Sequence, residues 1–187
     1  MIRRTGTRAL LALTVAASLA ACGGDQETTA PAATASTAAG STGAQECETR
    51  AATAEAPAET STDLSEAPEV TPSDAPPPCD LVISDVVVGD GAEAVEGSTV
   101  ELKYVGAFYE TGEEFDSSWS RGADETLPVT LGEGRVIPGF EQAVYGMQVG
   151  GRRIATIPSD LGYGPQGQGP IPGDATLVFV LDLVEVS

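Results

Sequence analysis

The uneven distribution of large apolar side chains along this 187-residue chain limits where it can fold. From Gly23 to about Pro78 the sequence is mostly Ala, Thr, Ser, Glu, Pro and Gly, with no aromatic residue and almost no large aliphatic one. Such a stretch buries too little apolar surface to offset the entropy lost on ordering. We therefore expect residues 23–78 to be a disordered acidic linker and residues 79–187 to form the folded domain.

Residues 1–22 have the features of an export signal. A basic start, with Arg3, Arg4 and Arg8, precedes the apolar run ALLALTVAASLAA, which is too short to span a bilayer. The run ends in Leu-Ala-Ala-Cys, which resembles the bacterial lipobox, so we expect Cys22 to be lipidated and to become the mature N-terminus. An ordinary secretory signal with an incidental Cys22 is the alternative. The lipobox predicts an extracytoplasmic protein that is lipid-anchored to the bacterial cell membrane.

Charge and composition exclude several functions. The net charge of −19 would repel a phosphate backbone, so nucleic acid is not an expected partner. The chain has no histidine, which excludes Ser-His-Asp and Cys-His triads and imidazole metal ligands. The carboxylates follow no calcium-loop spacing. We therefore expect neither a metal nor a cofactor.

Two cysteines remain if Cys22 carries lipid, and an extracytoplasmic location permits disulfides. A bond between Cys47 and Cys79 would close a loop of about 32 residues and contribute ~3–4 kcal/mol in the chain-entropy model. Two free thiols, or pairing with another chain, are the alternatives.

Alternating apolar residues predict several strands after Asp80. The strand-like segments are 81–91, 99–106, 127–132, 152–158 and 176–186. The more apolar face of the last segment, which should line the core, carries Leu177, Phe179, Leu181 and Leu183. We expect Arg152-Arg153 to be a strand pair with solvated ends.

One segment has helical spacing. The residues at i, i+3, i+4 and i+7 are Phe140, Ala143, Val144 and Met147, and Pro138 suits the helix start. Several antiparallel strands with one short helix predict an α+β fold, in which a five- to six-stranded sheet curls around the helix. The Gly- and Pro-rich stretch after Pro158 is too long for a simple connector and indicates a functional loop.

Five motifs, in order, cover the predicted domain. They are VELKYVG (100–106), EEFDSSWSRG (113–122), LGEGRVIPGFEQAVYGMQVGGRR (131–153), TIPSDLGYG (156–164) and IPGDATLVFVLDLVEV (171–186). Together they resemble the FKBP family, the macrolide-binding peptidyl-prolyl cis-trans isomerases. The resemblance implies the same curled sheet around a short helix.

The resemblance also implies a set of site residues. Those expected to act on the reacting bond are Tyr104, Phe115, Asp116, Ile137 and Tyr163. Those expected to bind the rest of the substrate are Arg121, Leu127, Val136, Phe140, Ile171 and Phe179. Two positions depart from the family pattern, because Phe140 replaces a usual tryptophan and Leu127 replaces a common phenylalanine. These departures bear on drug affinity and substrate preference.

Each implied residue has a role. The Tyr163 hydroxyl and the Ile137 amide would each donate to a substrate carbonyl, and Ile171 would close over the proline ring. Asp116 would orient tyrosine hydroxyls or face the reacting carbonyl, with Arg121 compensating its charge. By itself, however, Asp116-Ser117-Ser118 is typical of a turn. Trp119 is expected at the rim, with no catalytic role.

The expected function is a prolyl isomerase that assists the folding of exported proteins. Its partners would be proline-containing unfolded or loop segments, with macrolides as further ligands, and we expect a monomer. A non-catalytic module that binds proline-containing peptides, as a chaperone or scaffold, is the alternative. A third reading places the binding in the acidic linker, and it would be excluded if deletion of residues 23–78 left isomerase activity intact.

Overall fold

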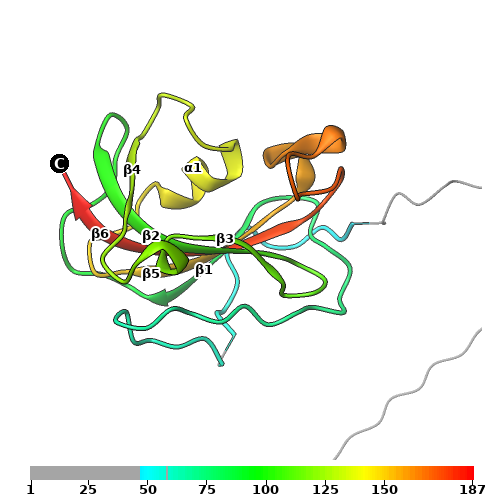
Figure 1. The fold of residues 1–187 in the computed structure, drawn as a ribbon, viewed down its shortest axis with the longest axis horizontal. Helices are drawn as coiled ribbons and strands as arrows, with labels where there is room; N and C mark the ends of the chain where they lie inside the picture. Colours follow the sequence, from blue (N-terminus) through cyan, green and yellow to red (C-terminus); the bar gives the residue numbers. More distant parts are fainter. Residues whose placement is uncertain (1–46, 58) are drawn as a thin grey trace, which may run out of the picture. The chain divides into compact units, whose positions relative to one another are not determined.

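A computed structural model describes residues 47–57 and 59–187, and Cys22 and the signal segment lie outside this range. The described residues form one six-stranded antiparallel sheet with a single α-helix on one face (Figure 1). The predicted α+β class and the predicted helix are therefore confirmed.

The sheet has the strand order β1-β5-β6-β2-β3, and β4 pairs with β2 beside β3. The strands are β1 (Val82–Val87), β2 (Thr99–Phe108), β3 (Glu114–Ser117), β4 (Leu127–Thr130), β5 (Arg152–Ile157) and β6 (Leu177–Val186). Three 3-10 turns, η1 (Trp119–Arg121), η2 (Ser159–Leu161) and η3 (Gly164–Gln166), lie in the connections. The long strands β2 and β6 pair from Val100–Val186 to Phe108–Leu177 and form the centre of the sheet.

Helix α1 (Pro138–Val144) packs against the sheet through its buried residues. Phe140, Ala143 and Val144 join the core together with Leu102, Leu181 and other sheet residues. The helix comes very close to β5, because a Cβ atom on Gly139 would lie 2.3 Å from Cγ2 of Ile157. A side chain at this position would displace the helix, and glycine allows the close approach.

The core-facing residues of β6 are those that alternation predicted. Leu177, Phe179, Leu181 and Leu183 are all in the core cluster. The opposite face is buried as well, since Val178, Val180 and Asp182 are 8%, 2% and 2% exposed. The sheet is therefore covered on both faces over much of this strand.

The prediction that Arg152 and Arg153 have solvated ends is wrong. Arg152 is completely buried and makes a two-pronged ion pair with Asp182, with both N–O distances 2.6 Å. Arg153 pairs with Asp85 and donates to the carbonyls of Ala143 and Tyr145 at the end of α1. A cation at a helix C-terminus satisfies carbonyls that have no partner inside the helix.

The second layer over the sheet is a segment that the sequence predicts to be disordered. Residues 47–57 and 59–78, here called the strap, run along the face opposite α1 (Figure 1). Ala54 N–H donates to the Ile83 carbonyl and Ile83 N–H donates to the Ala52 carbonyl, so the strap pairs beside β1. This part of the linker has a defined course, whereas residues 23–46 lie outside the described residues.

A polar group of the domain binds the strap. The buried Arg152 guanidinium donates to the carbonyls of Ser61 and Glu66, at 2.9 and 3.0 Å. Within the strap itself, Arg50 donates to Pro76 O at 2.7 Å and so joins its two ends. The number of apolar residues does not predict this ordering. Every residue has a main-chain carbonyl, and the sequence does not show which carbonyls will accept a hydrogen bond from the domain.

A disulfide joins Cys47 to Cys79 and closes the two ends of the strap on each other. Of the three cysteine states considered from the sequence, the structure therefore contains the Cys47–Cys79 bond. Within residues 47–57 and 59–187, no helix is long and apolar enough to cross a bilayer.

Candidate active site

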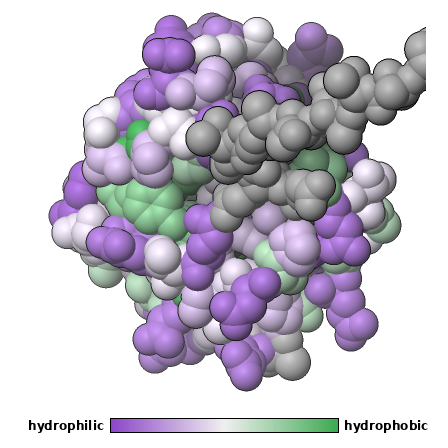
Figure 2. Space-filling model, turned by 90° about the vertical axis from the view of Figure 1, so that its right-hand side faces the viewer, coloured by the Kyte–Doolittle hydropathy of each residue, from purple (hydrophilic) through white to green (hydrophobic). Residues whose placement is uncertain are grey.

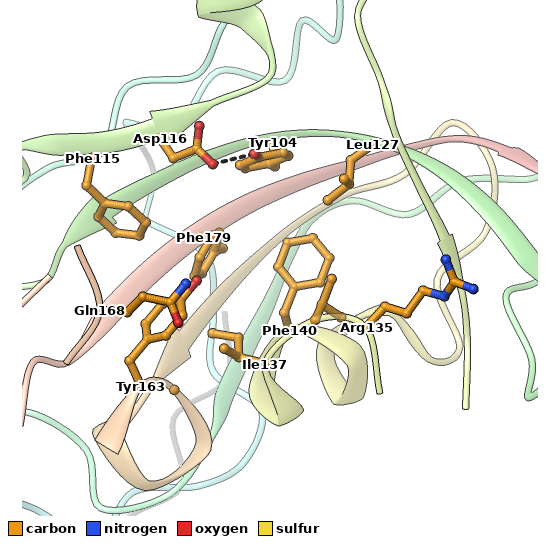
Figure 3. A pocket seen from close by; sticks show the side chains of 12 residues that line it. Tyr104, Phe115, Asp116, Leu127, Arg135, Ile137, Phe140, Tyr163, Gln168 and Phe179 are labelled. Carbon is orange, nitrogen blue, oxygen red and sulfur yellow. Dashed lines mark hydrogen bonds between the residues drawn. The ribbon is translucent and has the colours of Figure 1, made fainter. Parts of the chain in front are cut away.

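A pocket of about 560 Å³ opens between α1, the strands β2 and β3, and the loop that follows β5 (Figure 3). This volume is in the usual range for small-molecule and peptide side-chain sites. Its lining residues are Tyr104, Phe115, Asp116, Leu127, Arg135, Val136, Ile137, Phe140, Gly162, Tyr163, Gln168 and Phe179.

Aromatic rings form most of the apolar wall. Phe179 lies at the centre, edge-on to Phe140 and Phe115 with centroid distances of 5.3 and 5.6 Å. Tyr104 is edge-on to Phe140 at 6.1 Å. Edge-to-face packing at these distances is the favourable geometry for aromatic pairs, and it fixes the rings relative to one another. The result is a rigid apolar surface on which a ring the size of proline can rest.

Asp116 is the acidic residue of the pocket, and its two oxygens are already engaged. Oδ2 accepts a hydrogen bond of 2.5 Å from the Tyr104 hydroxyl. Oδ1 accepts from Arg121 at 2.8 Å and from the Ser117 amide at 2.9 Å. Arg121 also donates to the Tyr104 hydroxyl at 3.0 Å, which closes a triangle of three side chains.

A bulge in β3 explains how Phe115 and Asp116 both line the pocket. Adjacent residues of a regular strand point to opposite faces. Here Gly106 pairs with Asp116 and Ala107 pairs with Glu114, so Phe115 is the extra residue of the bulge. Bulges redirect side chains in this way and are common beside functional sites.

Two further residues hold this arrangement in place. Ser118 is fully buried, and its hydroxyl oxygen accepts from the Tyr104 amide at 3.0 Å, while its amide donates to the Tyr104 carbonyl. At Gly106, a Cβ atom would lie 2.8 Å from ring atoms of both Phe115 and Phe179. The aromatic wall therefore requires glycine at this position, which the sequence motif contains but the sequence analysis did not single out.

Two hydrogen-bond donors at the pocket have no partner among residues 47–57 and 59–187. One is the Tyr163 hydroxyl, and the other is the amide of Ile137, the residue that precedes α1. Burial is the main cause that raises the pKa of the Tyr163 phenol, and the charge of Asp116 adds to it. The hydroxyl therefore keeps its proton at neutral pH and can donate to a bound carbonyl.

The structure brings together nine of the eleven residues that the resemblance assigned to the site. Arg121 does not line the pocket, but it contacts it indirectly through Asp116 and Tyr104. Ile171 does not line the pocket either; it is 7% exposed and lies in the same core cluster as Tyr104, Phe140 and Phe179. Its main chain exchanges two hydrogen bonds with Gln168, so it anchors the turn that places Gln168 at the pocket.

Three lining residues were missed. Arg135 precedes the predicted pocket pair Val136–Ile137, and Gly162 precedes Tyr163, so proximity along the chain was the available signal for both. Gln168 lies in the Gly-rich loop and carries no such signal. Figure 3 shows Arg135 at the end of the pocket away from Phe115.

Trp119 was expected at the rim, but it is not among the residues that line the pocket. Lys103 lies over its ring, with the ammonium nitrogen 4.3 Å from the centroid. A cation over an indole face is a stabilising contact, so the structure gives Trp119 a packing role.

Comparison with known proteins gives a consistent result. Residues 91–184 match the family model described as FKBP-type peptidyl-prolyl cis-trans isomerase. The chain is 49% identical over 119 residues to a probable FK506-binding protein of Corynebacterium glutamicum, covering 64% of this chain and 98% of the relative. It is 51% identical over 124 residues to an FK506-binding protein of Streptomyces anulatus, covering 65% and 98% of the two chains.

Solved structures share the fold. The crystal structure of AtFKBP13 is similar with a TM-score of 0.53 and 35% identity, over 57% of this chain and 93% of that one. The crystal structure of FkpA from Escherichia coli is similar with a TM-score of 0.52 and 34% identity, over 64% of this chain and 52% of that one.

Proposed function

The chain belongs to the FKBP-type peptidyl-prolyl cis-trans isomerases, and from this premise we propose that it accelerates X–Pro rotation in exported or cell-surface proteins. The single observation that carries the proposal is the position of two free donors, Tyr163 O–H and Ile137 N–H, beside a rigid aromatic wall. Such a site can hold the carbonyls on either side of a proline while the ring rests on apolar surface.

Amide resonance sets the energy barrier. Partial double-bond character gives rotation a barrier of about 18–20 kcal/mol. The twisted amide has less charge separation than either planar form, so a dry aromatic pocket favours it relative to them. No covalent intermediate and no proton transfer are needed, which agrees with the absence of histidine from the chain.

Asp116 acts in this scheme as a fixed orienting group. Its oxygens accept from Tyr104, Arg121 and the Ser117 amide, so it places a partly compensated negative charge at one side of the pocket. It also keeps the Tyr104 ring in position against Phe140 and Phe179.

An isomerisation assay tests the enzyme. The full chain is added to a peptide with an apolar residue before proline, and the cis–trans exchange rate is measured by NMR. Acceleration by the wild-type chain supports catalysis. Peptide binding without any acceleration would overturn it in favour of a non-catalytic binding module. Titration with FK506 checks macrolide binding, which the names of the relatives motivate.

We also propose that Cys22 carries the lipid anchor. Leu19-Ala20-Ala21-Cys22 motivates this proposal. If the strap stays on the domain, only residues 23–46 separate the anchor from Cys47, which allows a span of at most about 80–85 Å. Fractionation of cells that express wild-type or Cys22→Ser protein checks it. The wild type should sediment with membranes and the variant should not; equal distribution would contradict lipidation.

A further inference from the structure

A second groove, of about 730 Å³, lies beside the pocket. Its walls come from three parts of the chain: the two ends of the strap, the turn between β2 and β3, and the loop after β5. The lining residues are Cys47, Pro77, Pro78, Cys79, Phe108, Glu110, Thr111, Glu113, Pro158, Ser159, Asp160, Pro170, Pro172, Gly173, Asp174, Ala175 and Thr176. Figure 2 views the side of the domain that carries this loop and turn, and purple hydrophilic side chains surround green apolar patches there.

The groove and the pocket are neighbours, separated by two packed aromatic rings. Phe108 lines the groove, Phe115 lines the pocket, and their ring centroids are 5.2 Å apart. The loop after β5 also contributes to both, with Tyr163 on the pocket side and Asp160 on the groove side. A few residues of extended chain, at about 3.3–3.6 Å each, reach from one hollow into the other.

The charges that line the groove all have one sign. Glu110, Glu113, Asp160 and Asp174 are exposed there, and the lining contains no lysine or arginine. Over residues 47–57 and 59–187, none of these four carboxylates makes an ion pair. The pocket differs, because Asp116 is paired with Arg121 and Arg135 lies at the rim.

The groove also has few hydrogen-bond donors. Five of its lining residues are prolines, which have no N–H to offer. The amides of Cys79, Glu113 and Asp174 already donate within the protein. Apart from the hydroxyls of Thr111, Ser159 and Thr176, the groove therefore offers mainly carboxylates and carbonyls, which suit a ligand that carries donors and positive charge.

We infer that this groove binds a lysine- or arginine-bearing part of the same polypeptide whose proline occupies the pocket. The inference rests on the proposed function and narrows its substrates to chains with a basic residue a few positions from the proline. The strap wall of the groove lies outside residues 91–184, which match the family model. The four carboxylates lie within residues 91–184, so the charge preference comes from the matched domain, and the strap completes the wall of the groove.

The preceding segment of the chain is a poor occupant. Residues 23–46 contain Asp25, Glu27 and Glu46 and no lysine or arginine. Like charges repel, so this segment does not match the charge of the groove. A basic substrate segment does.

The test compares two peptides that differ in charge alone. One carries an apolar residue before a single proline with lysines on both sides two to four positions away, and the other has glutamine in place of each lysine. The ratio of their kcat/KM values is measured by NMR with the full chain, at low salt and at about 0.5 M salt. We expect the lysine peptide to be preferred about three- to tenfold at low salt, and screening should remove the preference at high salt.

Two variants with equal changes in net charge locate the effect. The groove variant is Glu110→Gln, Glu113→Gln, Asp160→Asn and Asp174→Asn, in which Asn suits the left-handed backbone of Asp174 (φ 62°). The control variant is Asp90→Asn, Glu93→Gln, Glu96→Gln and Glu185→Gln, at the opposite end of β2 and β6.

The groove variant should lose the preference and keep its turnover of the glutamine peptide, while the control should retain the preference. Equal ratios in the two variants, or no preference in the wild type, would overturn the inference while leaving the isomerase intact. Failure of the wild type to accelerate either peptide would instead overturn the proposed function.

Discussion

At the scale of single residues, the polar groups of the pocket are of two kinds. Some are hydrogen-bonded within the protein, and others are available to a substrate. Asp116 has an internal partner on each of its oxygens, while Tyr163 O–H and Ile137 N–H have none within the part of the chain that the structure describes. A general acid or base needs an oxygen that is free to exchange a proton with the substrate. The geometry therefore favours an orienting role for Asp116.

Tyr163→Phe tests the free hydroxyl. The change removes one hydrogen bond to the substrate carbonyl, and one neutral hydrogen bond corresponds to about a three- to tenfold loss in kcat/KM. Tyr145→Phe removes the same atom outside the pocket lining and should have no effect. Equal rates for Tyr163→Phe and wild type in the NMR assay would show that the hydroxyl has no role.

Asp116→Leu tests the orienting carboxylate. It removes the acceptor of the Tyr104 and Arg121 hydrogen bonds, so we expect about a tenfold or larger fall in kcat/KM, since a hydrogen bond to a charged group is worth about 1.5–3 kcal/mol. Circular dichroism should show an unchanged fold, because the Asp116 side chain is half exposed. Turnover equal to wild type would rule out the role.

The tyrosine pKa values predict how turnover depends on pH. Burial, followed by the hydrogen bond to Asp116, raises the pKa of Tyr104, and burial raises that of Tyr163. Raised values move the loss of these phenol protons above about pH 10. We therefore expect kcat/KM to be flat from pH 6 to pH 9. A bell-shaped profile in this range would indicate acid–base chemistry that the proposed mechanism does not contain.

At the scale of elements, the β3 bulge decides which side chains reach the pocket. Alternation along EEFDSS would place Phe115 and Asp116 on opposite faces, and the bulge brings them to one side. The bulge follows from the pairing of β3 with Gly106 and Ala107 of β2, a long-range contact that local sequence does not encode. The short helix is different, because its apolar spacing is local, and the structure confirms it.

Gly106→Ala tests the contact between this element and the aromatic wall. The new Cβ would lie 2.8 Å from rings of both Phe115 and Phe179, and overpacking of this kind costs about 1–3 kcal/mol. We expect weaker peptide binding, seen as a higher KM, together with a lower urea midpoint. Gln142→Ala on the exposed side of α1 is the control. A KM equal to that of wild type would show that the rings adjust without loss.

At the scale of the whole domain, the strap covers the sheet face opposite α1 and buries side chains there. The buried Arg152 pairs with Asp182 and binds two carbonyls of the strap. Deletion of residues 23–78 would therefore expose the Arg152–Asp182 ion pair to solvent and remove two of the acceptors of Arg152. Comparing that deletion with deletion of 23–46 in thermal unfolding checks this: the longer deletion should lower Tm and the shorter one should not.

Arg152→Leu is a sharper form of the same prediction. It leaves the Asp182 carboxylate buried and unpaired, and breaking a buried pair in this way costs about 3–5 kcal/mol. Arg135→Leu breaks an exposed pair and should change the free energy of unfolding by less than about 1 kcal/mol. Urea titration of both variants measures the difference. A similar decrease in the free energy of unfolding for both variants would show that the buried Arg152 pair contributes no more to stability than the exposed Arg135 pair.

The sequence by itself determined the family, the sheet with its single helix and most of the pocket, because these depend on local periodicity and on motifs at fixed positions. Only the tertiary structure decided the burial of Arg152, the position of Ile171 in the core, the course of the strap and the existence of the groove. These features arise where segments distant in the sequence come into contact. The strap is bound through its main-chain carbonyls, and prolines from several segments line the groove. Every residue has such a carbonyl, so composition and periodicity do not reveal which ones a buried guanidinium will bind.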